Sequence, residues 1–176
     1  MRKLLFLAIP VIAGALVSCG KGAKTADAGK DSVSMPYKAT YSSSFAITDS
    51  AKLVQTVLQS YKDWENNNLK NASAYFADTI AWDQTDGSKH RMTRDSMVKF
   101  FNKYRDSLTS SKIEMAAFIP LHSNDKKEDW VLTWYKQTDT YKNGKIDSTF
   151  YHDLNHIKNG KIDYISSLRQ TLKPQK

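Results

Sequence analysis

The side chains best suited to chemistry in a pocket lie near the C-terminus, in segments that alternate apolar and polar residues. Two-residue turns at Asn143-Gly144 and Asn159-Gly160 would place Tyr135 opposite His152, and His152 opposite Ser167. A histidine among hydroxyl groups can act as an acid, a base or a hydrogen-bonding anchor near neutral pH. His152 and Tyr135 are therefore the candidate catalytic pair, and a structural histidine bonded to Tyr135 is the alternative.

Three further features of the sequence have two interpretations each. Arg169 could receive an anionic ligand, since its planar fork matches a carboxylate, or it could reach solvent. His156, expected opposite Asp163, fits either the orienting pair of a histidine–carboxylate dyad or a surface ion pair of little energetic worth. Two tryptophans could wall a pocket or pack in the core: Trp64 and Trp82.

Composition argues against several classes of site. The chain has one cysteine, and its four histidines show no recognised metal-ligand spacing, so we expect no metal site. No phosphate loop or dinucleotide fingerprint occurs, and we expect no cofactor. The formal charge is +8, but half of the excess lies in residues 1–44 and the rest is interspersed with acids. A nucleic-acid partner is therefore not expected.

The N-terminus predicts a lipid anchor. A basic start at Arg2 and Lys3 precedes the apolar run 4–17, which is too short for a comfortable membrane span. The following sequence, Leu16-Val17-Ser18-Cys19-Gly20, resembles a bacterial lipobox. That resemblance implies cleavage before Cys19 and acylation of this cysteine with palmitate-type chains, whereas an ordinary signal with an incidental cysteine is the alternative.

The anchor determines the expected domain organisation and location. We expect a lipoprotein signal peptide over residues 1–18, the lipidated Cys19 with a flexible tether over 19–44, and a folded domain over 45–176. The lipid bilayer would then be a partner through acylated Cys19. By the lipobox resemblance, Gly20 is compatible with the outer membrane of the bacterial cell envelope, with the domain facing the periplasm.

Apolar periodicity predicts the elements that must position these side chains. Spacings of three and four residues predict a helix from Ser50 through residue 65, a short helix over 72–76, and a third helix that begins at Thr93 and extends to Leu108. A strand is expected over 79–83. Beyond residue 110 the period changes to two, which predicts four strands over 112–119, 129–140, 145–157 and 161–172. The order is that of an α+β fold.

The two copies of Lys-Asn-Gly-Lys-Ile-Asp, at 142–147 and 158–163, are interpreted as one turn type used twice. Two-residue loops then divide the strands into two faces. One face would carry Tyr135, His152, His156, Ser167 and Arg169. The other would carry Trp130, Trp134, Tyr151, Asp153 and Tyr164.

Residues 51–172 resemble the nuclear transport factor 2-like (NTF2-like) superfamily, especially its SnoaL-like bacterial members. The likeness rests on the first-helix stripe, Tyr75-Phe76-Ala77-Asp78, Asp86-Gly87 and Asn159-Gly160-Lys161-Ile162. It implies a cone in which three N-terminal helices pack on a curved, mostly antiparallel sheet, with a pocket at the open end. In the superfamily's enzymes the last strand turns the face of Ser167 and Arg169 inward.

The resemblance also implies partners. Members often dimerise through the outer face of the sheet, so a homodimer is expected, with these candidates at the dimer face: Trp130, Trp134, Tyr151 and Tyr164. The ketosteroid isomerases of the superfamily carry a base where this chain has Gln84, and their oxyanion-binding tyrosine falls near Ser60, with Tyr61 one step away. A glutamine cannot take up a proton, which argues against that isomerase chemistry.

Three functions remain open at this point. The first is a membrane-anchored lipoprotein that binds a small, partly apolar ligand in the pocket between helices and sheet. The second is a pocket enzyme of isomerase or hydrolase type that uses His152 and Tyr135. The third is a non-catalytic interaction module of the envelope whose pocket is filled by side chains.

Overall fold

The computed structural model describes residues 35–171, so Cys19 and the predicted signal peptide lie outside the described residues. Residues from Lys38 onward form one structural unit, to which the following account is restricted. No helix within this described part is long and apolar enough to cross a membrane. The elements in chain order are β1 (Phe45–Ile47), α1 (Ala51–Glu65), the 3-10 helix η1 (Leu69–Asn71), α2 (Ala72–Tyr75), β2 (Phe76–Asp83), β3 (Lys89–Thr93), α3 (Arg94–Arg105), β4 (Leu108–Ser123), β5 (Glu128–Tyr141), β6 (Ile146–Lys158) and β7 (Lys161–Thr171).

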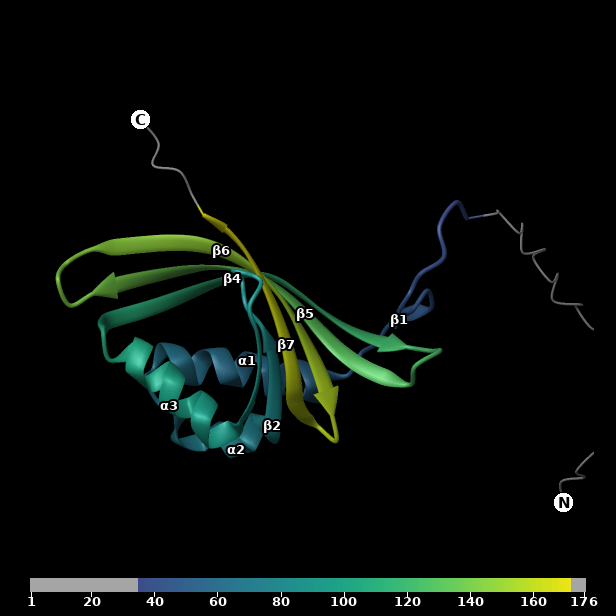
Figure 1. Ribbon diagram of the computed structural model, residues 1–176, viewed down its shortest axis with the longest axis horizontal. Coiled ribbons are helices and arrows are strands. Elements are labelled where there is room, and N and C mark those ends of the chain that lie inside the picture. The colour runs from purple at the N-terminus through teal and green to yellow at the C-terminus, as the bar shows by residue number, and fades with distance from the viewer. Residues whose placement is uncertain (1–34, 172–176) are drawn as a thin grey trace, which may run out of the picture. The chain divides into compact units, whose positions relative to one another are not determined.

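The strands form one curved sheet in the order β1-β4-β5-β6-β7-β2-β3 (Figure 1). Neighbouring strands are antiparallel except for β2 and β7, which are parallel. Register shifts interrupt the β4–β5 and β6–β7 pairs, and such bulges bend a strand and increase its twist. Helices α1, α2 and α3 lie against one face, called the inner face below. The α+β arrangement predicted from the sequence is confirmed.

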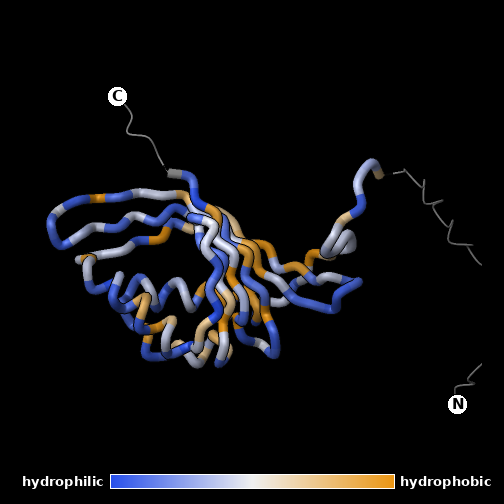
Figure 2. The backbone as a smooth tube through the Cα atoms, in the orientation of Figure 1, coloured by the Kyte–Doolittle hydropathy of each residue, from blue (hydrophilic) through white to orange (hydrophobic). Residues whose placement is uncertain are grey.

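The core forms where the amphipathic helices meet this inner face. Val57 of α1 and Met97 of α3 are fully buried and pack with Ile80, Val131 and Ile162 of the sheet. Each such side chain contributes about 1.5–3 kcal/mol through removal of apolar surface from water. Figure 2 shows hydrophobic residues concentrated along the middle of the strands, whereas the hairpin turns are hydrophilic.

Most helix boundaries follow the expected signals. Thr93 occupies the N-cap of α3, where its hydroxyl accepts a 3.2 Å hydrogen bond from the Ser96 amide. The prediction that Leu108 belongs to this helix is wrong, because α3 ends at Arg105 and Leu108 begins β4 with its side chain buried. Strand β3 was missed because its residues are mostly exposed and charged, so no apolar alternation marks it.

The two identical hexamers form different turns. In the β6–β7 hairpin, Asn159 and Gly160 both have positive φ, 52° and 72°, which is the expected two-residue type I′ turn. In the β5–β6 hairpin only Gly144 has positive φ, 83°. Tyr141 there pairs with Lys145 through a 2.8 Å backbone hydrogen bond, so three residues form the loop. The prediction that one turn type is used twice is therefore wrong.

This extra loop residue shifts the pairing of β6 by one position. Tyr135 pairs with Tyr151 and Trp134 pairs with His152, so the expected Tyr135–His152 pairing is wrong. Because side chains alternate between faces, a one-residue shift moves every side chain of β6 to the opposite face. Asp153 therefore lies on the inner face, and His152 lies on the outer face.

A second register change follows the type I′ turn. The pairs next to the turn are as predicted, but a bulge at Asp163 changes the register beyond it. His156 consequently pairs with Tyr164, and His152 pairs with Leu168. The expected pairings of His156 with Asp163 and of His152 with Ser167 are wrong. The bulge compensates for the first shift, so Ser167 and Arg169 remain on the inner face.

Candidate functional site

A cavity of about 310 Å³ lies between the inner face of the sheet and helices α1 and α3. Most of its wall is apolar or aromatic, and apolar side chains come from η1, α3 and the three strands β2, β4 and β7. They include Leu69, Phe76, Phe100, Phe101, Ile113 and Ile165. The volume falls at the small end of the range for ligand pockets, about 300–1,000 Å³.

Asp153 forms the polar centre of this wall, and its side chain is only 5% exposed. Its Oδ2 atom accepts hydrogen bonds from the hydroxyls of Tyr135 (2.8 Å) and Tyr61 (2.9 Å). The Tyr61 hydroxyl lies 2.9 Å from Thr133 Oγ1 and accepts a 3.3 Å hydrogen bond from Asn155 Nδ2. The second oxygen, Oδ1, is buried and has no hydrogen-bond partner among the described residues.

Burial determines the protonation of these groups. Burial raises the pKa of Asp153 above its usual value, while the neighbouring hydroxyl groups of Tyr135, Ser167 and Tyr61 offset part of that rise. Ser167 lies opposite Asp153, although its hydroxyl makes no hydrogen bond of normal geometry to it. Burial, together with the charge of Asp153, raises the pKa of Tyr61 and of Tyr135 well above 10. Both phenols are therefore protonated at neutral pH and act as donors.

This arrangement has a defined chemical capacity. A carboxyl with a raised pKa can hold a proton on Oδ1 and donate it in a hydrogen bond, or release it and take it back. A buried polar atom without a partner costs free energy, and a ligand that supplies the partner recovers that cost. Asp153 therefore has one oxygen, Oδ1, that can still form a hydrogen bond.

A second buried carboxyl, Asp139, does not line the cavity but contacts Tyr104 and Gln137, which do. Its oxygens accept hydrogen bonds from Ser111 (2.6 Å), Gln137 (2.9 and 3.0 Å) and Tyr104 (3.1 Å). The Trp64 indole donates to Ser111 at 3.0 Å, which links α1 to this network. Asp139 therefore fixes the helices on the sheet and leaves no oxygen for a ligand.

Most of the predicted pocket residues line the cavity. They are Tyr61, Trp64, Trp82, Tyr135, Ser167 and Arg169. Their roles in ligand binding stay predictions. Gln84 also lines the cavity, whereas the carboxylate of the adjacent Asp83 accepts a 3.0 Å hydrogen bond from Tyr164 and lies 3.3 Å from the Lys89 amine.

Two predicted positions are wrong because β6 is shifted. His152 lies on the outer face, where its ring packs edge-on to Trp134 at 6.0 Å, and it is not part of the cavity. Tyr151, predicted on the outer face, lines the cavity and stacks on Tyr135 at 5.3 Å. Asp153 and Asn155 were missed as site residues for the same reason. Expecting a three-residue loop in the β5–β6 hairpin would have placed both residues on the inner face.

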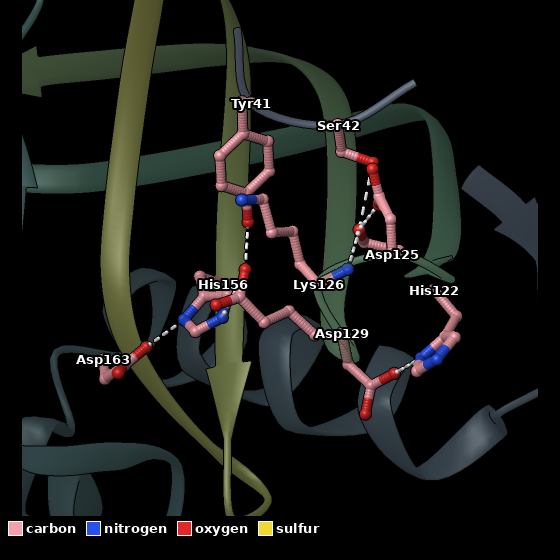
Figure 3. A network of polar contacts seen from close by, with 10 residues as sticks. Tyr41, Ser42, His122, Asp125, Lys126, Asp129, His156 and Asp163 are labelled. Atoms are coloured by element: carbon pink, nitrogen blue, oxygen red, sulfur yellow. Dashed lines mark hydrogen bonds and ion pairs between the residues drawn. The ribbon is translucent and has the colours of Figure 1, made fainter. Parts of the chain in front are cut away.

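Trp130, Trp134 and Tyr164 lie on the outer face as predicted. There Trp130 packs against the His156 ring at 4.8 Å, and the bulge brings Asp163 Oδ1 within 2.5 Å of His156 Nδ1 (Figure 3). His156 Nε2 lies 3.9 Å from Glu128 Oε2. The His156–Asp163 pair thus belongs to a cluster on the outer face, away from the cavity.

This outer cluster also holds the residues that precede β1. The Tyr41 hydroxyl donates to Glu128, and Ser42 Oγ donates to Asp125 at 2.5 Å (Figure 3). Hydrogen bonds from Ser42 and Ser123 lower the pKa of Asp125 to about 2. Residues 41–44, expected at the end of the tether, therefore pack on the β4–β5 hairpin.

No family model and no curated protein sequence matches the chain. Solved structures do match. An epoxide hydrolase of the LEH-like type from Mycobacterium tuberculosis shares 9% identity over 70% of this chain and 86% of its own, with a TM-score of 0.59. NTF2-like proteins of unknown function from Burkholderia pseudomallei and Exiguobacterium share 16% and 15% identity, with TM-scores of 0.56 and 0.55. They cover 68% and 65% of this chain, and 92% and 98% of their own.

These similarities agree with the sheet order and with the helices on its inner face. Identities this low establish the architecture and not the activity. The domain formed by the described residues therefore has the NTF2-like fold.

Proposed function

We propose that this protein binds a small, partly apolar molecule in the cavity between α1, α3 and the sheet. The observation that carries the proposal is that Asp153 lines this cavity and that its buried Oδ1 atom has no hydrogen-bond partner among the described residues. Aromatic and aliphatic walls would hold the apolar body of the ligand, and Asp153 would orient its polar end. The function that requires a filled pocket is less well supported, because the cavity is open.

The proposal is tested by calorimetric titration of the full chain with 2-naphthol, a two-ring molecule with one hydroxyl. Binding should be lost in Ser167→Phe, which places a ring in the cavity opposite Asp153, and in a second filling variant, Ile165→Phe. The matched control is Ser166→Phe on the outer face of the same strand, which should bind like the unmodified protein. Equal binding by all four proteins would show that the probe binds elsewhere.

A second candidate function is catalysis in the same cavity, with Asp153 in place of the predicted His152. It is supported by the protonation chemistry of Asp153, and a structure with the same fold is an epoxide hydrolase. The test is conversion of styrene oxide to its diol by the unmodified chain and by Asp153→Asn. Diol formation that depends on Asp153 supports an enzyme. Turnover that is absent, or that persists in Asp153→Asn, rejects this role.

We also propose that Cys19 anchors the domain to a membrane of the bacterial envelope. The support is the lipobox-like sequence at residues 16–20. Labelling of a bacterial expression host with an alkyne analogue of palmitate should mark the unmodified chain and not Cys19→Ser. The domain should fractionate with outer membranes and face the periplasm. Label retained in Cys19→Ser would contradict the assignment.

Homodimer formation through the outer face of the sheet completes the proposal. This face carries half-buried or exposed apolar residues on adjacent strands, among them Leu132, Trp134, Leu154 and Leu168. Contiguous apolar surface of this kind commonly marks a protein contact. A charge placed on this face, as in Leu168→Asp, should prevent the contact.

A further inference from the structure

The cavity contains two side chains of the charged residue types. Of the described residues that line it, Asp153 and Arg169 alone belong to the aspartate, glutamate, lysine, arginine and histidine classes. The tyrosines of the wall are protonated at neutral pH, because burial raises their pKa values. When Asp153 holds its proton, the positive charge of Arg169 is the remaining formal charge of the wall.

Arg169 and Asp153 occupy the same wall at two different points. Ser167 is the cross-strand neighbour of Asp153. Arg169 follows Ser167 by two residues and therefore lies on the same face of β7. Two residues of extended strand correspond to about 7 Å. A ligand that reaches both side chains must therefore carry two polar groups joined by an apolar body.

Arg169 is available for such a contact. Its side chain is exposed at the edge of the cavity, and none of the ion pairs found among residues 35–171 involves it. Three acids lie close enough to raise the pKa of Tyr151, namely Asp139, Asp147 and Asp153, and Arg169 opposes them. Asp139 is fully hydrogen-bonded and Asp147 is exposed, so neither holds the guanidinium.

We propose that the cavity binds a small organic carboxylate that carries a hydroxyl or carbonyl oxygen at its opposite end. The carboxylate is held by the guanidinium of Arg169, whose fork matches its two oxygens. The distal oxygen bonds to Oδ1 of Asp153, which satisfies the buried atom that lacks a partner. This inference rests on the proposed ligand-binding function and specifies the chemical class of the ligand.

The probes are chosen to separate the two contacts. The compound 6-hydroxy-2-naphthoate carries a hydroxyl and a carboxylate on opposite rings, and 2-naphthol lacks the carboxylate. Calorimetry of the full chain should give about tenfold tighter binding of 6-hydroxy-2-naphthoate than of 2-naphthol. This factor is near the lower limit of what a hydrogen bond to a charged group contributes, because Arg169 is exposed to solvent. Added salt should weaken binding of the acid and leave that of 2-naphthol unchanged.

Variants assign this preference to one side chain. Arg169→Gln should remove the tenfold preference without changing the affinity for 2-naphthol, and Arg169→Lys should retain part of it. The control is Arg91→Gln, which removes the same charge from an exposed position of β3 outside the cavity and should change neither affinity.

The outcomes separate this inference from the proposed function. Binding of 2-naphthol together with an acid affinity that Arg169→Gln leaves unchanged would overturn the inference and preserve ligand binding. Failure of the unmodified chain to bind either probe would count against both. Salt-independent binding of the acid would also overturn the inference, and that measurement needs no variant.

Discussion

Tyr135 donates a 2.8 Å hydrogen bond to Oδ2 of Asp153, diagonally across the β5–β6 pair. The tyrosine holds one oxygen of the buried carboxyl, while Oδ1 is buried and has no hydrogen-bond partner among the described residues. Tyr61 reinforces the same arrangement from α1. The predictions below follow from this unequal use of the two oxygens and from the register that produces it.

The first prediction concerns stability and pH. The folded-state pKa of Asp153 is raised above the 3.8 of an unperturbed aspartate, so the folded chain binds more protons than the unfolded chain between these two values. Its contribution to stability is therefore lost as pH rises from about 4 to the folded pKa. Urea unfolding should show that Asp153→Asn gains stability relative to the unmodified protein over this interval, by about 1.4 kcal/mol for each unit of pKa shift.

The control for this experiment is Asp147→Asn, which removes an exposed carboxyl from the same strand. If the stability difference between Asp153→Asn and the unmodified protein does not change with pH, the carboxyl of Asp153 is not shifted.

The second prediction concerns the hydrogen bond itself. Tyr135→Phe removes one of the two donors to Asp153 and should lower the free energy of unfolding by about 1–2 kcal/mol. Tyr151→Phe is the matched change, since Tyr151 stacks on Tyr135 at 5.3 Å but does not hydrogen-bond to Asp153. Thermal or urea unfolding should show the larger loss in Tyr135→Phe. Equal losses would mean that the Tyr135 hydroxyl stabilises the fold no more than the Tyr151 hydroxyl does, which would contradict a stabilising hydrogen bond to Asp153.

The third prediction uses the repeated hexamer. Asn159 has a positive φ of 52°, a conformation that costs most L-residues about 1–2 kcal/mol, whereas Asn143 does not have positive φ. The Asn143 Oδ1 atom accepts one exposed hydrogen bond from the Lys145 amide. Asn159→Ala should therefore destabilise the domain by about 1 kcal/mol, more than Asn143→Ala does. The reverse order would contradict the assignment of the type I′ turn to the second copy.

The fourth prediction concerns the outer face of the sheet. Leu168 is 61% exposed there, and Leu168→Asp should convert a dimer to a monomer in light-scattering measurements. Phe118→Asp is the control, because Phe118 is 46% exposed but lines a separate groove beside the N-terminus of α1. If the unmodified chain is a monomer, the outer face does not form the proposed contact.

The sequence predicted the elements well where a local signal exists. Thr93 caps α3 as its residue type suggests, and the amphipathic stripe of α1 includes the buried Val57. The type I′ turn at Asn159-Gly160 was also predictable, because both residues tolerate positive φ. These features depend on a few neighbouring residues and not on the rest of the fold.

The site was harder to predict, because its composition depends on one loop residue. Both faces of β6 carry bulky and polar side chains, so alternation alone does not show which face is buried. The same Asn-Gly signal permits loops of two or three residues, and the choice decides whether His152 or Asp153 faces the cavity. The register of β6 is set by packing across the whole sheet, and a short motif does not encode that packing.

The measurement that tests this account most directly is a carbon-13 NMR titration of the Asp153 carboxyl, assigned by its loss in Asp153→Asn. The account predicts a midpoint above 3.8 in the free protein, and a further rise when 2-naphthol removes the remaining water from the cavity. A midpoint near 3.8 that 2-naphthol leaves unchanged would contradict the assignment of Asp153 as the polar centre of a ligand site.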